Sequence, residues 1–427
     1  MDMLGLLDIP YWLLLTVVVL AAIYLYTTWP YSTWSRLGIP GPKPQYFHGN
    51  SKEVIKKTML KAVDDWKTQY GRVFGLYFGR SPILVVSDLD ILREVLVKEF
   101  NNFSDRFFVT GGTRPAVVDK GLFFVGGPAW KRIRTLMTPA FTSSKLKHMC
   151  HYIQRCSRIL EEILVEKSRR EEPIDVKAVF GAFTMDVIAG TAFGLETNSQ
   201  TREDEPFVVN CRKFFGKLNS GGSGWVLRIV GVFPFLAPLV QTLGLTVFAE
   251  EEADFFLQSV YEMVDERKKA SSDRKKRTDF LQLLVDAEAD SDQVADSRDG
   301  DGEEKSYKRM TREEVAGQGF VILMAGYETT STTLQFLTYN LALHQDVQQR
   351  VYEEIIDTIG DADPTYDNVG GLKYLDSVIH ETLRLFPPVA MINRRARQTT
   401  RILGCDHPCW LWSRCPHPQY YARSRIL

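Results

Sequence analysis

The sequence has little cysteine and almost no net charge. Six cysteines are spread over 427 residues, too few and too scattered for a disulfide scaffold, which indicates a protein body in a reducing, cytosol-facing compartment. Lysine and arginine number 52 against 53 aspartate and glutamate, and the net charge is −1. Because the basic residues are scattered rather than gathered in a stripe, no nucleic-acid-binding surface is indicated.

What is present is the composition of a globular chain. Hydrophobic residues make up 44% of the sequence, aromatic residues 12% and charged residues 25%. These proportions allow a sizeable core. The length suits one large domain or two ordinary ones.

One long apolar run stands out near the N-terminus. Residues 11–26 read YWLLLTVVVLAAIYLY. A span needs roughly 20 apolar residues, so the run must recruit Leu4, Leu6 and Leu7 or cross a thin bilayer such as the endoplasmic reticulum. A cleaved signal peptide is the alternative, but a charged n-region is missing and aromatic residues follow in place of a cleavage site. We predict an uncleaved membrane anchor over residues 1–28, single-pass, with the body facing the cytosol.

A proline-rich segment follows the anchor. Residues 37–44 read LGIPGPKP, and three prolines in five residues fix the backbone and exclude a helix. Such a segment is stiff and extended, although Pro-Gly clusters are also ordinary loop punctuation. We predict a spacer over residues 29–45 that holds a body over 46–404 at a set distance from the bilayer.

Helical periodicity dominates from residue 145 onward. Residues 73–79 and 83–87 instead predict a short strand pair with a helix after it over 88–97. An acidic, Ser- and Asp-rich stretch, 288–304, is expected to be a disordered surface loop. The predicted fold is mainly α with a small β element, and the later helices are expected at 153–165, 176–192, 248–268, 279–287, 312–343, 345–359 and 372–385.

The helix predicted over 312–343 carries the most informative motif, Ala325-Gly326-Tyr-Glu328-Thr329-Thr330. A helix of about 30 residues is about 45 Å long and must cross a whole domain. Small residues at its middle permit close approach of something flat, and a threonine bonded to the carbonyl four residues earlier can open the helix locally. The alternative is that Ala325 and Gly326 pack another helix while the threonines fill a groove.

A second motif is Glu381-Thr-Leu-Arg384 followed by Leu-Phe-Pro-Pro. Glu381 and Arg384 are spaced to form an ion pair on one helix. A solvated pair is the simple alternative. Because the flanking residues are apolar and two prolines end the helix, we expect a buried pair that anchors a neighbouring loop.

Two further matches, Trp130-Lys-Arg-Ile-Arg134 and Arg395, complete an ordered set of motifs. From the anchor to about Gly404 the chain resembles the cytochrome P-450 superfamily of haem-thiolate monooxygenases, in particular the microsomal animal clan of family 3 and thromboxane synthase. The resemblance implies that a haem lies against Ala325 and Gly326, and that Thr329 with Glu328 delivers protons in oxygen activation. It also implies that the Glu381–Arg384 pair supports the meander before the haem loop. By the same resemblance, the residues that contact the haem propionates are Trp130, Arg134 and Arg395.

The resemblance also implies the substrates and partners. It implies oxygen, electrons from NADPH through a reductase, cytochrome b5 as a further partner, and a bulky lipophilic substrate. Core packing is an equally good interpretation of each candidate pocket residue taken singly. Those candidates are Phe107, Phe108, Phe207, Phe214, Phe215 and Met391.

The family pattern stops at Cys405. From there the chain reads CDHPCWLWSRCPHPQYYARSRIL, where the family has strands, the meander and the F-x-x-G-x-R-x-C-x-G loop with the cysteine that binds iron. A zinc site is one interpretation, since the tail has suitable ligands, but their spacing fits no standard finger. A frameshift fits better, because the codons of Trp410 and Trp412 would each yield glycine in the shifted frame. The zinc ligands would be Cys405, His407, Cys409, Cys415 and His417.

These features lead to an expectation about the chain as written. We predict an out-of-frame tail over 405–427, no cysteine ligand for iron, and weak haem binding or none. Since a thiolate ligand favours O–O cleavage, monooxygenase activity is then not expected. A non-enzymatic, truncated isoform that sequesters partners at the membrane is the alternative function.

Overall fold

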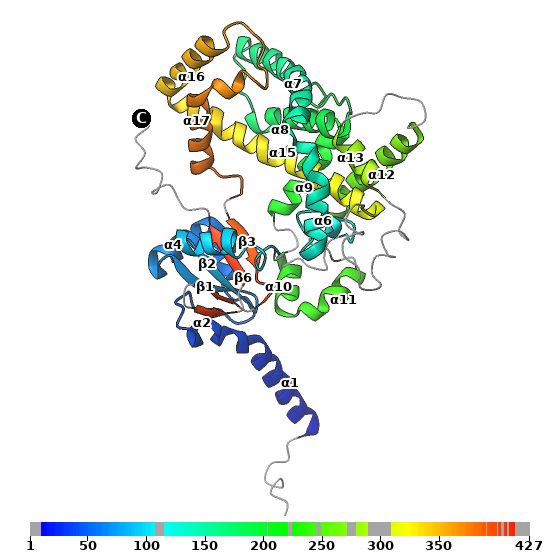
Figure 1. The fold of residues 1–427 in the computed structure, drawn as a ribbon. Helices are drawn as coiled ribbons and strands as arrows, with labels where there is room; N and C mark the ends of the chain where they lie inside the picture. The colour runs from blue at the N-terminus through cyan, green and yellow to red at the C-terminus, as the bar shows by residue number, and fades with distance from the viewer. Residues whose placement is uncertain are drawn as a thin grey trace, which may run out of the picture. The chain divides into compact units, whose positions relative to one another are not determined.

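The structure, a computed structural model, is mainly helical and divides into two compact units (Figure 1). Unit 1 comprises Met1–Gly111, Ser223–Leu245 and Met391–Pro416, and unit 2 comprises Gly112–Gly222, Thr246–Ala390 and His417–Leu427. The predicted fold class, mainly α with a small β element, is confirmed. The structure describes residues 10–106, 115–202, 204–220, 224–243, 245, 249–270, 279–288, 309–389, 391–398, 400–402, 405–407 and 410–414.

Unit 1 holds the described strands. Its main sheet has the order β1-β2-β6-β3, with β2 and β6 parallel and the other two pairs antiparallel. The strands are β1 (Val73–Phe78), β2 (Ser81–Val86), β3 (Met391–Arg395) and β6 (Trp410–Arg414), and β4 (Thr400–Ile402) pairs separately with β5 (Cys405–His407). The helices are α1 (Tyr11–Thr28), η1 (Trp29–Ser32), α2 (Thr33–Arg36), α3 (Ser51–Lys57), α4 (Met59–Tyr70), α5 (Leu89–Arg93), η2 (Glu94–Lys98), α10 (Gly224–Val232), η6 (Pro234–Leu236) and α11 (Ala237–Thr242).

The predicted strand pair forms the β1–β2 hairpin, and its side chains alternate between two apolar clusters. Phe74 and Leu76 lie opposite Val85 and Ile83 and pack with Trp66 of α4. The alternate residues of both strands pack in a second cluster with Trp34 of α2. Both faces of the hairpin are therefore buried, which explains why its sequence is an apolar run rather than a polar–apolar alternation.

The segment predicted to be a spacer is partly helical and lies against the sheet. Residues 29–36 form η1 and α2, and the indole Nε1 of Trp34 donates to the Leu76 carbonyl at 3.0 Å. The Gly75 amide donates to the Pro40 carbonyl at 2.9 Å. The prolines do exclude a helix over 39–44, as predicted. A buried tryptophan and these hydrogen bonds attach the segment to unit 1.

Unit 2 is built around one helix, α15 (Arg312–Leu343), which has the predicted bounds and packs against α8 and α12. Figure 1 shows it, in yellow, running through the helices of this unit. The stretch predicted to be an acidic loop lies, apart from Glu288, outside the described residues. The remaining elements are η3 (Val118–Lys120), α6 (Gly127–Met137), η4 (Thr138–Phe141), α7 (Ser143–Arg169), α8 (Val176–Ile188), η5 (Ala189–Phe193), α9 (Pro206–Ser220), α12 (Glu250–Ala270), α13 (Phe280–Ala287), α16 (Gln345–Thr358), η8 (Val369–Gly371) and α17 (Lys373–Leu385).

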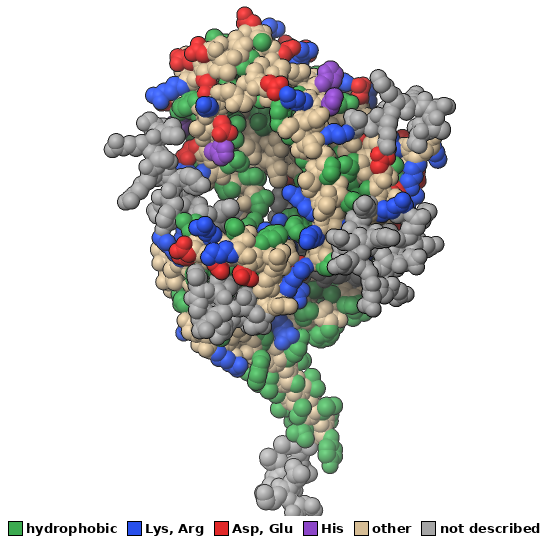
Figure 2. Space-filling view, in the orientation of Figure 1, with side chains coloured by type: hydrophobic (Ala, Val, Ile, Leu, Met, Phe, Trp, Pro, Cys, Tyr) green, Lys and Arg blue, Asp and Glu red, His purple; other side chains and the backbone are tan. Residues whose placement is uncertain are grey.

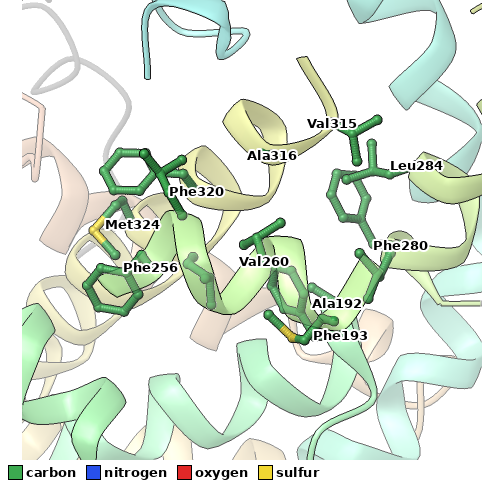
Figure 3. Close-up of a cluster of buried hydrophobic side chains, with 14 of the residues drawn as sticks. Ala192, Phe193, Phe256, Val260, Phe280, Leu284, Val315, Ala316, Phe320 and Met324 are labelled. Atoms are coloured by element: carbon green, nitrogen blue, oxygen red, sulfur yellow. The ribbon is translucent and has the colours of Figure 1, made fainter. Parts of the chain in front are cut away.

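Aromatic and aliphatic side chains from α12, α13 and α15, together with residues of α6, α8, η5 and α9, make the core of unit 2. Figure 3 shows Phe256 and Val260 of α12 beside Phe320 and Met324 of α15. Phe280 and Leu284 of α13 extend the same cluster. The first half of α15 is therefore held on several sides by apolar contacts, which fixes the position of the residues that follow it.

The start of α15 is also fixed by polar contacts. Thr311 and Glu314 form a capping box, with the Glu314 amide 3.2 Å from Thr311 Oγ1 and the Thr311 amide 3.0 Å from Glu314 Oε2. The guanidinium of Arg132, on α6, forms a two-pronged ion pair with the Glu314 carboxylate, and both side chains are nearly buried. One turn later, the Gln318 amide joins Lys120 and Leu122 of the η3 segment.

Replacing Arg132 with alanine should therefore lower the free energy of unfolding by about 3 kcal/mol or more, because one partner of a nearly buried ion pair is left unpaired. The matched control is Lys57→Ala, which removes two exposed ion pairs, with Glu53 and with Asp65, and should change the stability far less, because water screens exposed charges. Urea unfolding followed by circular dichroism measures both. Equal losses for the two variants would contradict the expectation.

Candidate functional site

The middle of α15 has two faces with different surroundings. Gly326 faces α8, since a Cβ built on it would lie 2.8 Å from Ile188 Cδ1. Ala325 is exposed, and Thr329, one turn on, donates from Oγ1 to the Ala325 carbonyl at 2.8 Å. The two sequence interpretations therefore apply to different residues. Gly326 packs against another helix, whereas Ala325 is exposed and Thr329 is half-buried.

Glu328 points toward α8 and meets a lysine that the sequence analysis missed. Lys177 Nζ lies 2.8 Å from Glu328 Oε1 and 2.9 Å from Thr332 Oγ1. Both charged side chains are partly exposed. Lys177 and Asp186 are the two charged residues of α8, and a lysine in so apolar a helix was the available signal. The contact holds the Glu328 carboxylate beside the α15 backbone at the turn that contains Thr329.

Tyr327 lies between these residues, on the buried side of α15. Its ring stacks on Phe215 with centroids 6.0 Å apart, and its carbonyl accepts from Thr184 Oγ1 at 3.1 Å. Burial, and then the neighbouring Cys211, raises the pKa of Tyr327 to about 12. The phenol is therefore neutral at physiological pH and acts in packing rather than in proton transfer.

The residues predicted to line a substrate pocket are divided between the hydrophobic clusters of the two units. Phe214 is buried in the core of unit 2, and Phe215 and Phe207 pack against that core. Met391 begins β3 and packs against the apolar cluster around Trp66. These positions favour core packing over a substrate pocket within each unit. Phe107 and Phe108 lie outside the described residues.

The Glu381–Arg384 ion pair is present near the end of α17. Arg384 Nε donates to Glu381 Oε2 at 2.6 Å, and the carboxylate raises the pKa of Arg384. The expected burial is not found for the acid, because the Glu381 side chain is 53% exposed and that of Arg384 is 20% exposed. Arg384 Nη1 is buried and has no hydrogen-bond acceptor among the described residues. The pair thus offers one unused donor, which a further loop could satisfy.

The residues expected to contact the haem propionates lie on two elements, helix α6 and strand β3. Trp130 and Arg134 are one turn apart on one face of α6, where Trp130 is partly buried and Arg134 exposed. Arg395 ends β3, with its amide donating to the Asp105 carbonyl at 2.8 Å. Trp130 and Arg134 belong to unit 2 and Arg395 to unit 1.

A haem needs a surface on which its flat ring can lie and a side chain that binds its iron. The described residues offer such a surface but no suitable iron ligand. The exposed Ala325, beside the half-buried Thr329, leaves a small-residue surface that a flat group could approach. Two of the described cysteines do not suit a thiolate ligand, because burial raises the pKa of Cys156 to about 11 and also raises the pKa of Cys211. No cluster of three His, Cys, Asp or Glu side chains suited to a metal ion occurs in the part of the chain that the structure describes.

Residues 39–409 match the family model described as Cytochrome P450. The chain is 37% identical over 405 residues to cytochrome P450 3A29 of Sus scrofa, covering 93% of this chain and 75% of that protein. It is 37% identical over 415 residues to cytochrome P450 3A7 of Homo sapiens (96% and 77%) and 36% identical over 414 residues to cytochrome P450 3A5 of Homo sapiens (96% and 78%).

The chain belongs to the cytochrome P450 family. Its family chemistry is that of a haem-dependent monooxygenase, an oxidoreductase that uses oxygen and electrons supplied by a reductase, generally on lipophilic molecules. The predicted family, cofactor and enzyme class are confirmed. The match extends to residue 409, five residues past the predicted boundary at Gly404.

Proposed function

We propose that the exposed turn of α15 is the oxygen-activating face of this cytochrome P450. Haem, when bound, supplies the iron that activates oxygen. Thr329 holds its hydroxyl proton toward the Ala325 carbonyl and can turn it outward, while Glu328 holds a carboxylate one residue away. The observation that carries the proposal is that Ala325 is exposed, with Thr329 half-buried one turn on, directly after the part of α15 that is packed in the core. Lys177 holds the Glu328 carboxylate in one position.

The remaining site residues would bind the haem and orient it. Arg134 and Arg395 each carry a cation, and Trp130 carries an indole N–H, of the kind that a haem propionate binds, because planar guanidinium groups pair well with carboxylates. The Glu381–Arg384 pair would anchor the segment that precedes the haem loop, and the unused Nη1 donor of Arg384 supports this role.

The 427 residues do not contain the F-x-x-G-x-R-x-C-x-G motif, and burial raises the pKa of both Cys156 and Cys211. We propose that a polypeptide of these residues alone has no monooxygenase activity. The strands β5 and β6 fall in the tail assigned to a shifted frame, but backbone pairing needs no particular side chains and so does not decide the frame. Of the proposed zinc ligands, Cys409, Cys415 and His417 lie outside the described residues.

Sequencing the transcript and genomic exon through codons 398–427 tests the proposed frameshift. One base fewer should restore a frame that leads into the haem-loop motif. If both sequences stand as written, the shifted frame is wrong, and the non-enzymatic membrane-bound isoform becomes the favoured function.

We also propose that α1 is a single-pass anchor in the membrane of the endoplasmic reticulum. The body of the protein then lies in the cytosol, where it meets its reductase and cytochrome b5. Hydrophobic side chains cover α1 (Figure 2), with Tyr11 90% and Trp12 67% exposed. Tyr26 at its end stacks on Phe233, and Phe235 nearby is exposed. The other apolar helix long enough to span, Val176–Phe193, is 61% buried in unit 2, so α1 is the better anchor.

Replacing Leu15 and Val18 with lysine should release the protein from the membrane pellet into the supernatant, since each charge near the centre of a span costs about 2.5–3.5 kcal/mol. Replacing both with isoleucine is the control and should leave the protein in the pellet after alkaline washing. Mass spectrometry of the N-terminus separates the anchor from a signal peptide. Removal of the first residues up to the aromatic segment would refute the anchor.

A further inference from the structure

Two arginines lie against aromatic rings where α1 ends. The guanidinium carbon of Arg80, in the turn between β1 and β2, is 3.8 Å from the centre of the Tyr26 ring. That of Arg36, at the end of α2, is 5.3 Å from the centre of the Trp29 ring. Because Tyr26 and Trp29 are three residues apart in continuous helical backbone, they are neighbours on one side of it. Both positive charges therefore lie where α1 meets the rest of unit 1, and Figure 2 shows basic side chains beside this end of α1.

The guanidinium of Arg80 has no acceptor and no acidic partner among the described residues, although the side chain is half-buried. Its Nε is buried. Its backbone is fixed, since its amide donates to the Gly231 carbonyl at 3.3 Å. A charge that is partly removed from water costs free energy unless it is paired and hydrogen-bonded. An incoming anionic oxygen would supply the acceptor that this guanidinium lacks.

We propose that Arg80 binds the phosphate of a membrane phospholipid. The planar donor pairs of a guanidinium match the oxygens of a phosphate. Tyrosine and tryptophan favour the headgroup level of a membrane, so Tyr26 and Trp29 place the neighbouring arginines where the phosphates lie. Only this placement rests on the proposed anchor. Arg36 is exposed and has no ion pair among the described residues, and it adds a second cation that attracts anionic lipids.

Free phosphate has the same oxygens as a lipid headgroup, but the surroundings of Arg80 are apolar. The Tyr26 ring stacks on Phe233, with centroids 5.9 Å apart and planes at 2° to one another. Phe235 meets the Tyr26 ring edge-on and is 65% exposed. An exposed aromatic side chain next to a cation that lacks an acceptor suits a ligand with both an anionic and an apolar part. These contacts favour a phosphate that carries acyl chains.

Calorimetric titration of the purified full chain in a neutral detergent tests the site. The two probes are dihexanoylphosphatidylglycerol and dihexanoylglycerol, which have the same acyl chains and differ in the phosphate headgroup. The wild type should bind the phospholipid about ten-fold more tightly, as one charged hydrogen-bonded contact provides. Arg80→Gln should abolish this preference. Arg93→Gln, which changes an exposed arginine of α5 in the same unit, is the matched control and should keep it.

Arg80→Met is a second variant should the glutamine variant fail to fold, because an apolar stem can still lie on the Tyr26 ring. It should also lose the preference. Retention of the preference in both Arg80 variants, or its absence in the wild type, overturns the proposal. Inorganic phosphate should bind more weakly than the phospholipid, whereas equal binding that is lost in Arg80→Gln assigns the site to free phosphate and overturns the lipid. Since the titration is made in detergent, its failure counts against Arg80, whereas a cleaved N-terminus counts against the anchor.

Discussion

Replacing Gly317 with alanine should destabilise the protein by about 2 kcal/mol, although alanine is the better helix former by about 1 kcal/mol. A Cβ at this position of α15 would lie 2.7 Å from the Val117 carbonyl oxygen and 3.0 Å from the Gly121 amide nitrogen. Both atoms are backbone, so no side chain can rotate away, and the η3 segment would have to move as a whole. The loss of close contact then outweighs the gain in helix propensity.

Gly216 provides the matched control. It lies inside α9, and a Cβ built on it meets nothing within 4 Å. Gly216→Ala should therefore stabilise the protein by about 1 kcal/mol. Denaturant unfolding of both variants gives the two changes. A shift in the same direction for both would mean that the η3 segment does not lie as closely on α15 as the structure has it.

Local patterns predicted most of the helices of unit 2. The predicted range of α15 is the observed one, because its capping box at Thr311 and its end near His344 are signals carried by neighbouring residues. The predicted helix over 279–287 begins one residue later, with Asp279 as its N-cap. The same kind of local signal identified the Thr329–Ala325 hydrogen bond, which depends only on the four-residue spacing in one helix.

Contacts between residues far apart in the sequence could not be predicted from such local patterns. The ion pairs Arg132–Glu314 and Lys177–Glu328 join residues more than 150 positions apart, and neither carries a local spacing signal. The partly exposed state of Glu381 was missed for a similar reason. Flanking apolar residues indicate that some part of a helix is covered, but which face is covered depends on what packs there.

The remaining prediction concerns the iron ligand. Reconstituted with haemin, reduced and exposed to carbon monoxide, the 427-residue polypeptide should show no thiolate-type Soret band. A thiolate needs a cysteine whose pKa is lowered by nearby positive charge or metal, whereas burial raises the pKa of Cys156 and of Cys211. Cytochrome P450 3A29 of Sus scrofa, prepared in parallel, is the positive control, because the chain matches 75% of it at 37% identity.

A thiolate-type band in this polypeptide would contradict the prediction and would also identify where to look. Serine substitution of Cys150, Cys156 and Cys211 would leave the band unchanged if the ligand came from the tail, and Cys405→Ser, Cys409→Ser and Cys415→Ser would then each be tested singly. Loss of the band in one variant would make that sulfur the iron ligand in place of the family's haem loop. Absence of the band in the wild type, with normal folding by circular dichroism, leaves the α15 face intact but without the electron-donating ligand that O–O cleavage requires.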